Sequence, residues 1–178
     1  MVEIHTPHLA LRPYDAADAE RMAGLHADPA VMEFMKDSKT LSRDEAAATF
    51  QRYVQGWERD GFGLFAVRLE VDDVFIGECG FWHRPDKPGV SMRFLMHRAY
   101  WGHGFGREMN EAATAWLFSE TDVMSFWAVT QSRNKGAVAI LRRLGGHVSE
   151  TAHMGIEGLL RFDVTRSAWE KSRANLQD

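Results

Sequence analysis

The sequence is poor in the features that mark disulfide-rich, metal-binding and membrane proteins. It has a single cysteine among 178 residues, Cys79, which excludes an internal disulfide framework and a metal site made of several cysteines. No apolar run reaches the roughly 18 residues that a membrane-spanning helix requires, so we expect no membrane partner. The eight histidines form no His-Glu-x-x-His pattern, so we expect no bound metal.

A strong excess of one charge is also missing. Lys and Arg total 21 and Asp and Glu total 25, which gives a net charge of -4. Domains that bind nucleic acid through its phosphates are usually basic, so we expect no direct nucleic-acid partner. Residues 1–13 show no basic patch followed by an apolar block, which would mark a secretory signal. Together with the single cysteine, this favours a cytoplasmic location.

The chain does have an ordinary supply of core-forming residues. Hydrophobic residues make up 45% and charged residues 26%, the balance of a globular protein. Six Trp and eleven Phe indicate an aromatic core, an aromatic cleft or both, and they are compatible with a homodimer. No internal repeat or linker-like stretch interrupts the chain, so we expect one domain over residues 1–178.

The spacing of apolar residues predicts both strands and helices. The strands are predicted at Leu9–Pro13, Leu64–Glu70, Val74–Phe81, Val90–Met96, Met124–Thr130 and Leu159–Thr165. Helices are predicted before Asp28, behind the capping box of Ser42 and Glu45, after Gly106, over Asn134–Leu144 and, briefly, at the end of the chain. A strand-helix-strand step predicts two parallel neighbours, and a hairpin predicts antiparallel ones. The expected fold class is therefore α/β (α+β), with one mixed sheet and helices on its faces.

The sharpest local feature is the run Gly102-His103-Gly104-Phe105-Gly106 between a predicted strand and a predicted helix. Glycines leave backbone N–H groups uncovered, and N–H groups at the start of a helix form an anion site. Arg98 and Arg107 flank the run and can add positive charge. The run has neither the ending of a Walker loop nor G-x-G-x-x-G spacing, so it predicts a phosphate site of another kind. A glycine turn without a ligand is the alternative.

Several further landmarks occur in a fixed order along the chain. They are Leu11-Arg12-Pro13; Asp28-Pro29 with Val31-Met32; Trp57 with Gly61-Phe62-Gly63; Ile76 to Phe81; Tyr100 to Arg107; Asn134 with Leu141 and Leu144-Gly145; and Asp163 with Trp169. In this order the chain resembles the GNAT N-acetyltransferases, and within them the RimJ/RimL-like branch, from about Leu9 to Trp169. The resemblance implies a mostly antiparallel sheet of six to seven strands, splayed at two central parallel strands.

The resemblance also implies a site for acetyl-CoA as co-substrate in the gap between these two strands, without a metal. The pantetheine would pair with the first of them, at Phe94, Leu95 and Met96. The pyrophosphate would sit on the glycine turn, which comprises Trp101, Gly102, His103, Gly104, Phe105, Gly106 and Arg107. An asparagine after the second strand would hold the pantetheine, and Asn134 stands at that place.

The sequence departs from the family pattern at several positions. Trp101 stands where Arg or Gln is common, Ser91 where a Glu is common, Ala137 where a Ser is common, and Gly146 where a Phe is common. Many members protonate the leaving thiolate with a late tyrosine. The tyrosines here are Tyr14, Tyr53 and Tyr100, none of them late.

The function that the resemblance implies is transfer of an acetyl group to a primary amine. The RimJ/RimL-like branch points to the α-amine of a protein N-terminus. A small-molecule amine, such as an antibiotic or a polyamine, is an alternative acceptor. A non-catalytic acyl-CoA-binding module, or a structural dimer with an empty turn, is an alternative function. An α-amino group has an ordinary pKa near 8, against about 10.4 for lysine, so it needs less help from a base at pH 7.

Three residues are candidates for the catalytic chemistry. Glu78 is the first candidate for the base, because alternation predicts that it shares a sheet face with Val74, Ile76 and Gly80, where glycines leave room for a ligand. The alternative is an edge-strand charge that meets solvent. His83 can do the same work near neutral pH, or is a surface histidine. Ser91 can hold a water or assist the thiolate, or is a plain strand serine.

Cys79 offers an acyl-cysteine route, but alternation predicts that it faces the core with Phe75 and Phe81. Four aromatic residues are candidates to line the acceptor cleft: Trp57, Phe62, Phe81 and Trp82. Choice of acceptor is expected to depend on loops near Met32–Thr40 and His83–Gly89, in which Asp37 can meet a cationic acceptor.

Overall fold

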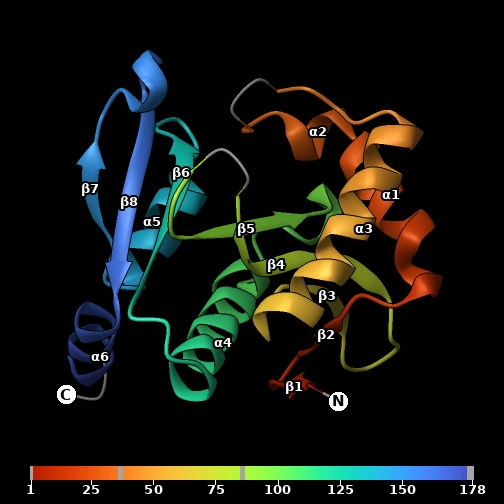
Figure 1. The fold of residues 1–178 in the computed structure, drawn as a ribbon, viewed down its shortest axis with the longest axis horizontal. Helices are drawn as coiled ribbons and strands as arrows, with labels where there is room; N and C mark the ends of the chain where they lie inside the picture. Colours follow the sequence, from red (N-terminus) through yellow and green to blue (C-terminus); the bar gives the residue numbers. More distant parts are fainter. Residues whose placement is uncertain (1, 36–37, 85–86, 176–178) are drawn as a thin grey trace.

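The computed structural model describes residues 2–35, 38–84 and 87–175, and these share one eight-stranded sheet (Figure 1). The strands are β1 (Ile4–His5), β2 (Leu9–Pro13), β3 (Leu64–Leu69), β4 (Phe75–His83), β5 (Val90–Met96), β6 (Ser125–Gln131), β7 (His147–Glu150) and β8 (Leu159–Thr165). Their spatial order is β1-β2-β3-β4-β5-β6-β8-β7. Among the described strands, only β5 and β6 pair in parallel, so the predicted mixed and mostly antiparallel sheet is confirmed.

The predicted number of strands, six to seven, is too low. The two strands without a sequence signal are β1 and β7, at the two edges of the sheet. β1 has only two residues, and three of the four residues of β7 are exposed. Neither strand shows the alternation of buried and exposed residues that a half-buried strand leaves in a sequence.

In the described parts of the chain, six α-helices and three 3₁₀ helices connect or follow the strands. They are η1 (Ala16–Asp18), α1 (Ala19–Ala27), α2 (Pro29–Met32), α3 (Arg43–Asp60), η2 (Arg98–Tyr100), α4 (Phe105–Glu120), α5 (Lys135–Arg143), η3 (His153–Gly155) and α6 (Arg166–Ala174). The predicted capping box is present at the start of α3: Glu45 N donates to Ser42 Oγ, and Ser42 N donates to the Glu45 carboxylate at 2.8 Å. α3 ends at Asp60, before Gly61, as the sequence predicts, and Gly61 is its C-cap.

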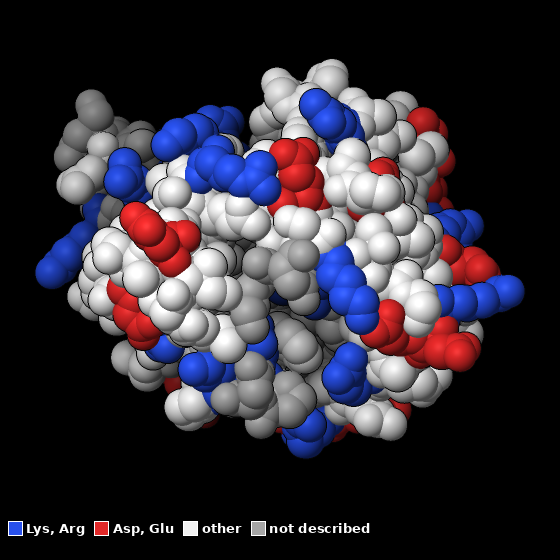
Figure 2. Space-filling model, turned by 90° about the horizontal axis from the view of Figure 1, so that it is seen from above, with Lys and Arg blue, Asp and Glu red and all other residues white. Residues whose placement is uncertain are grey.

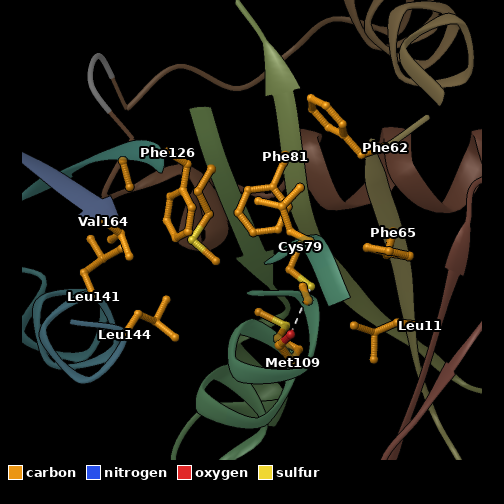
Figure 3. Packing of buried hydrophobic residues seen from close by; sticks show 14 of the residues in the cluster. Leu11, Phe62, Phe65, Cys79, Phe81, Met109, Phe126, Leu141, Leu144 and Val164 are labelled. Atoms are coloured by element: carbon orange, nitrogen blue, oxygen red, sulfur yellow. Dashed lines mark hydrogen bonds between the residues drawn. The ribbon is translucent and has the colours of Figure 1, made fainter. Parts of the chain in front are cut away.

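Helices cover both faces of the sheet and create two hydrophobic clusters. On one face, α4 packs its apolar stripe against the central strands; Figure 3 shows Met109 of α4 beneath Cys79 and Phe81 of β4, with Phe126 of β6 beside them. On the other face, α1 and α3 pack against β3 and β5 through a second cluster that includes Tyr53. Among the described residues, no helix combines the length and the hydropathy needed to cross a membrane.

A bulge in β4 changes which side chains share a face. Val67 of β3 pairs with Gly77, but the next residue, Arg68, pairs with Phe75, so Ile76 is left without a partner. Ile76 therefore joins the α4-side cluster, and Phe75 joins the opposite one. The predictions that Glu78 shares a face with Ile76, and that Phe75 lies beside Cys79, are wrong because both assume an unbroken alternation. Cys79 does lie with Phe81.

The glycines of β4 make room for neighbouring backbone rather than for a ligand. A Cβ atom on Gly77 would lie 2.3 Å from the carbonyl oxygen of Leu95 on β5. A Cβ atom on Gly80 would lie 2.3 Å from the carbonyl oxygen of Gly63, next to β3. The expectation that these glycines open space for a ligand is therefore wrong, and both serve close approach of strands.

The parallel pair β5–β6 is short. Its register covers only Val90 with Phe126 and Ser91 with Trp127. Beyond Ser91, the described residues of the two strands are not paired with each other, so the strands diverge toward their carboxyl ends. This divergence interrupts the sheet at its centre and positions the site.

Candidate functional site

A cavity of about 570 Å³ lies where β5 and β6 diverge. Volumes of this size are typical of sites for small molecules and cofactors. Its walls come from β5, the glycine turn, the first turn of α4, β6 and the first turn of α5. The cavity therefore occupies the gap between the two parallel strands, where the sequence predicts a ligand.

The edge of β5 that faces this cavity carries unpaired backbone groups. His97 N donates to Ile76 O at 2.9 Å, which places the backbone groups of Leu95 toward β4 in the antiparallel ladder. Because N–H groups alternate between the two edges of a strand, those of Met92, Phe94 and Met96 point toward β6. The indole of Trp101 donates to Met96 O at 2.9 Å. The backbone groups of Phe94 lie beyond the last pair of the β5–β6 register and are left to bind amide groups of a ligand.

The glycine turn ends in an open helix N-terminus. Gly102 and Gly104 have φ of 79° and 86°, the left-handed region that glycine adopts without strain. Gly104 is the N-cap of α4, and none of the side chains that the structure describes caps this end of the helix. The first backbone N–H groups of α4 therefore lack intrahelical acceptors and face the turn. Together with the helix dipole, they form a site for an anion.

Basic side chains dominate the charge around the cavity. The described lining residues include Arg84, Arg93, Arg107, Arg133 and Lys135, and none of the described lining residues is Asp or Glu. Seen from above, Lys and Arg side chains stand on both sides of the hollow between the two halves of the molecule (Figure 2). This charge favours an anionic ligand.

Comparison with known proteins identifies the fold and the family. The family described as acetyltransferase (GNAT) domain matches residues 8–147. The chain belongs to the GNAT acetyltransferase family. A relative from Bacillus licheniformis, described as N-acetyltransferase p20, is 23% identical over the whole of this chain and 93% of its own length.

Solved structures share the fold of this GNAT acetyltransferase. An acetyltransferase from Agrobacterium tumefaciens superposes with a TM-score of 0.81 at 20% identity, covering 93% of this chain and 95% of its own. RimL, a ribosomal L7/L12 α-N-protein acetyltransferase solved with coenzyme A, superposes with a TM-score of 0.77 at 14% identity, covering 94% and 99%. The chain is thus an acetyltransferase, and the neighbours are consistent with a RimJ/RimL-like branch.

Most residues that the sequence assigns to the cofactor line the cavity of this GNAT acetyltransferase. Those that do are Phe94, Leu95, Met96, Trp101, Gly102, Gly104, Gly106, Arg107 and Asn134. His103 and Phe105 are not among the lining residues; their rings stack on each other with centroids 5.7 Å apart. Asn134 is also the N-cap of α5, because its Oδ1 accepts a hydrogen bond from Ala137 N at 3.1 Å. Its amide nitrogen is the group that remains to donate to a ligand.

Glu78 lies outside the cavity, fully buried between α1, α3 and the sheet. Its carboxylate accepts hydrogen bonds from Tyr14 Oη at 2.7 Å, His26 Nε2 at 3.0 Å and Tyr53 Oη at 3.3 Å. Burial raises the pKa of Glu78, but His26, Arg93 and the Tyr14 hydroxyl together lower it to about 2. A carboxylate that stays ionised, and that the cavity does not reach, is poorly placed to accept a proton from a substrate.

The other two catalytic candidates lie in different surroundings. Ser91 is buried and lines the cavity at the point where β5 and β6 separate. His83 is exposed at the end of β4, with its ring 5.6 Å from that of Phe62, and it is not among the lining residues. Of the three candidates, the structure therefore brings only Ser91 to the cavity.

The four aromatic candidates for the acceptor cleft also lie in different places. Trp82 lines the cavity. Trp57 packs edge-on against Phe65 and donates its indole N–H to Leu64 O at 2.9 Å, while Phe62 and Phe81 belong to the α4-side core. The acceptor loops include residues 36–37 and 85–86, so Asp37 lies outside the described residues.

The lining residues that the sequence did not assign to the site include Arg93, Trp127 and His153. The sequence did contain a signal for Arg93. Arg93 shares a strand face with Ser91 and Leu95, and a charged residue is unusual in such a strand. Its guanidinium Nε lies 3.5 Å from Glu78 Oε1, so Glu78 lies directly behind the cavity wall. His153 had no signal, because its segment shows no periodic pattern. Within the described ranges, no three His, Cys, Asp or Glu side chains are grouped to hold a metal ion.

Proposed function

We propose that this acetyltransferase binds acetyl-CoA in the cavity between β5 and β6 and transfers its acetyl group to the α-amine of a protein N-terminus. The observation that supports this proposal is that the uncapped N-terminus of α4 and the unpaired edge of β5 border the same cavity. GNAT acetyltransferases use acetyl-CoA, whose phosphates and amides are the groups that these two features bind.

The residues present fit this co-substrate. The first N–H groups of α4 and the side chain of Arg107 would hold the pyrophosphate, and Lys135 adds a positive charge at the start of α5. The unpaired edge at Phe94 would hold the amides of the pantetheine. An N–H group on the same edge would polarise the carbonyl of the acetyl group, which bound acetyl-CoA presents as the electrophile. Positioning and this polarisation would supply most of the rate.

An α-amine is the acceptor that the chemistry favours. Its ordinary pKa near 8 leaves a larger neutral fraction at pH 7 than a lysine side chain has. RimL, described as an α-N-protein acetyltransferase, supports the same acceptor class. The described lining residues offer no carboxylate to a polycationic amine such as a polyamine or an aminoglycoside.

Acetyl-CoA is expected to raise the unfolding temperature of the wild-type protein. At about 100 times its Kd, the ligand adds about 2.7 kcal/mol, which corresponds to roughly 5–10 °C in a chain of this size. Gly104→Trp should abolish the shift, because its side chain would stand in the anion site. Gly61→Trp is the matched control: Gly61 has a similar φ of 71° and open space, but it lies at the end of α3.

The outcomes of this experiment are distinct. A shift in wild type and Gly61→Trp that is lost in Gly104→Trp supports the proposed cofactor site. No shift in the wild type at millimolar acetyl-CoA would refute acetyl-CoA binding. An equal shift in all three proteins would place the cofactor elsewhere.

The acceptor is tested by release of CoA thiol with a panel of amines. The panel holds a peptide with a free α-amine, the same peptide blocked at its N-terminus but with an internal lysine, spermidine and an aminoglycoside. We expect the free α-amine to react fastest. Preference for spermidine or the aminoglycoside would contradict the proposed acceptor, and binding without thiol release from any amine would indicate a non-catalytic module.

Cys79 is not expected to take part in the reaction. It is fully buried, its Sγ lies 3.6 Å from Met109 O, and burial raises the pKa of its thiol. Cys79→Ala should therefore retain acetyl transfer and lose about 1 kcal/mol of stability through lost packing. In the folded wild-type protein the thiol should not react with a disulfide reagent. A loss of more than tenfold in kcat in Cys79→Ala, with the fold intact, would support an acyl-cysteine route.

A further inference from the structure

A histidine in the connection between β7 and β8 lines the cavity and is paired with a carboxylate at the end of β7. His153 lines the cavity although only 3% of its surface is exposed, and its Nδ1 lies 2.6 Å from Glu150 Oε2. We infer that His153 accepts the proton of the acceptor amine through Nε2, and that Glu150 positions the imidazole. This inference rests on the proposed function and assigns the base that the sequence did not locate.

The pair determines which ring nitrogen is available. A carboxylate only accepts hydrogen bonds, so Nδ1 must carry the proton that joins His153 to Glu150. The neutral imidazole then has its lone pair on Nε2. None of the described residues hydrogen-bonds to Nε2, and this atom is not sealed from solvent, unlike His26 Nδ1. The free lone pair therefore belongs to an atom that a substrate in the cavity can approach.

The surroundings hold the ring in one place. Its centroid lies 6.1 Å from that of Trp127, which also lines the cavity and donates its indole N–H to Pro88 O at 3.1 Å. The backbone of η3 is closed by a hydrogen bond from Ile156 N to His153 O at 3.1 Å. In Figure 1, this connection lies at the top of the β7–β8 side, across from α2. The imidazole is therefore held at the wall of the cavity beside Trp127.

The charged groups near the pair do not compete for Nε2. Glu150 engages Nδ1, and its side chain is 46% exposed. Arg161 of β8 and Arg84 after β4 both place their guanidinium groups against the ring of Trp127, at 4.9 and 5.7 Å from its centroid. Both arginines are cations, so neither is a rival proton acceptor.

The reaction requires a proton acceptor at this place. An ammonium group cannot attack, so its proton passes to Nε2 and leaves a lone pair on nitrogen. That pair forms the C–N bond with the thioester carbonyl carbon, the C–S bond breaks, and its electron pair goes to sulfur. A second proton from nitrogen neutralises the thiolate, and His153 returns its proton to solvent. The net products are the acetylated amine, CoA thiol and one proton.

The first test does not depend on the acceptor. Nitrogen-15 NMR of histidine side chains in the wild-type protein, assigned by the signal lost in His153→Gln, reports which ring nitrogen is protonated. We expect the neutral ring to adopt the Nδ1–H form, and we expect this preference to be lost in Glu150→Gln. A predominant Nε2–H form would overturn the inference, because Nε2 would then have no lone pair.

The second test is kinetic and uses the best amine of the panel. His153→Gln should lower kcat by about 100-fold or more at pH 7, as loss of a general base does. It should also remove the acidic limb of the pH profile and leave KM for acetyl-CoA within twofold. Glu150→Gln should show a smaller loss in the same direction. His147→Gln is the matched control, since His147 is exposed on β7 and is not among the lining residues.

These outcomes separate the inference from the proposed function. Wild-type kcat and an intact acidic limb in His153→Gln would overturn the role of His153 while leaving the acetyltransferase in place. If the wild type acetylates no amine of the panel, the proposed function fails, and with it the catalytic role. The NMR result would then report only the geometry of the pair. A loss of acetyl-CoA binding in His153→Gln would show a structural role and would also overturn the inference.

Discussion

Replacement of Glu78 with alanine is expected to lower the free energy of unfolding by about 3–5 kcal/mol. The carboxylate is fully buried and accepts hydrogen bonds from Tyr14, His26 and Tyr53, with Arg93 Nε at 3.5 Å. Its removal would leave these donors without an acceptor in a place that water does not reach, and each such group carries a desolvation penalty. Urea unfolding followed by circular dichroism measures the change.

The control for this substitution is Glu58→Ala. Glu58 is exposed on α3, and surface changes of this kind usually alter stability by no more than about 0.5 kcal/mol. Equal stability of the two variants would show that the cluster around Glu78 contributes nothing to the fold.

The contribution of Glu78 can also be recognised in how the free energy of unfolding depends on pH. Its pKa in the folded protein is about 2, below the ordinary value of 4.5, because its partners outweigh the effect of burial. The stabilisation is therefore fully present above about pH 5 and is lost as the pH falls toward 2. The wild-type protein should lose stability steeply in this interval, and Glu78→Gln should show a flatter acid limb. Parallel acid limbs would contradict the assignment.

Gly80→Ala is expected to destabilise the protein by about 3 kcal/mol or more. The φ of Gly80 is 147°, a backbone conformation that residues with a side chain rarely adopt, and strain of this kind costs about 1–3 kcal/mol. The new Cβ would also lie 2.3 Å from Gly63 O and 2.9 Å from Leu64 Cα. Because both contacts are with backbone, β3 and β4 must separate, which adds the cost of overpacking. Thermal and urea unfolding measure the loss.

The matched control is Gly24→Ala, which should change stability in the opposite direction. Gly24 is exposed in α1, and a Cβ there would meet nothing within 4 Å. Alanine in a helix interior is more stable than glycine by about 0.5–1 kcal/mol. If Gly80→Ala were as stable as the wild type, the close approach of β3 and β4 would not require glycine.

Local signals in the sequence predicted much of the architecture. The capping box of Ser42 and Glu45 located the start of α3 because both hydrogen bonds join residues three apart. The run from Gly102 to Gly106 located the open N-terminus of α4, because spaced glycines mark a turn that residues with side chains do not follow. The resemblance to the GNAT acetyltransferases added the order of these elements, and the family match confirmed it.

The surroundings of the catalytic candidates could not be predicted from such local signals. Ile76 has no partner on β3, so the predicted faces of Phe75 and Ile76 relative to Cys79 and Glu78 were wrong. Glu78 receives its hydrogen bonds from Tyr14, His26 and Tyr53, which are 64, 52 and 25 residues away in the sequence. His153 reaches the cavity only because β7 and β8 pair at the far edge of the sheet.

The sequence by itself determined the positions of the main strands and helices, the glycine turn and the family. These depend on interactions within a few residues, which leave a period or a spacing along the chain. Tertiary structure alone decided which charged groups reach the cavity, that Glu78 is sealed behind Arg93, and that His153 of the β7–β8 connection lines the cavity. Those outcomes depend on the packing of distant segments and on a one-residue bulge, and neither leaves a periodic trace in the sequence.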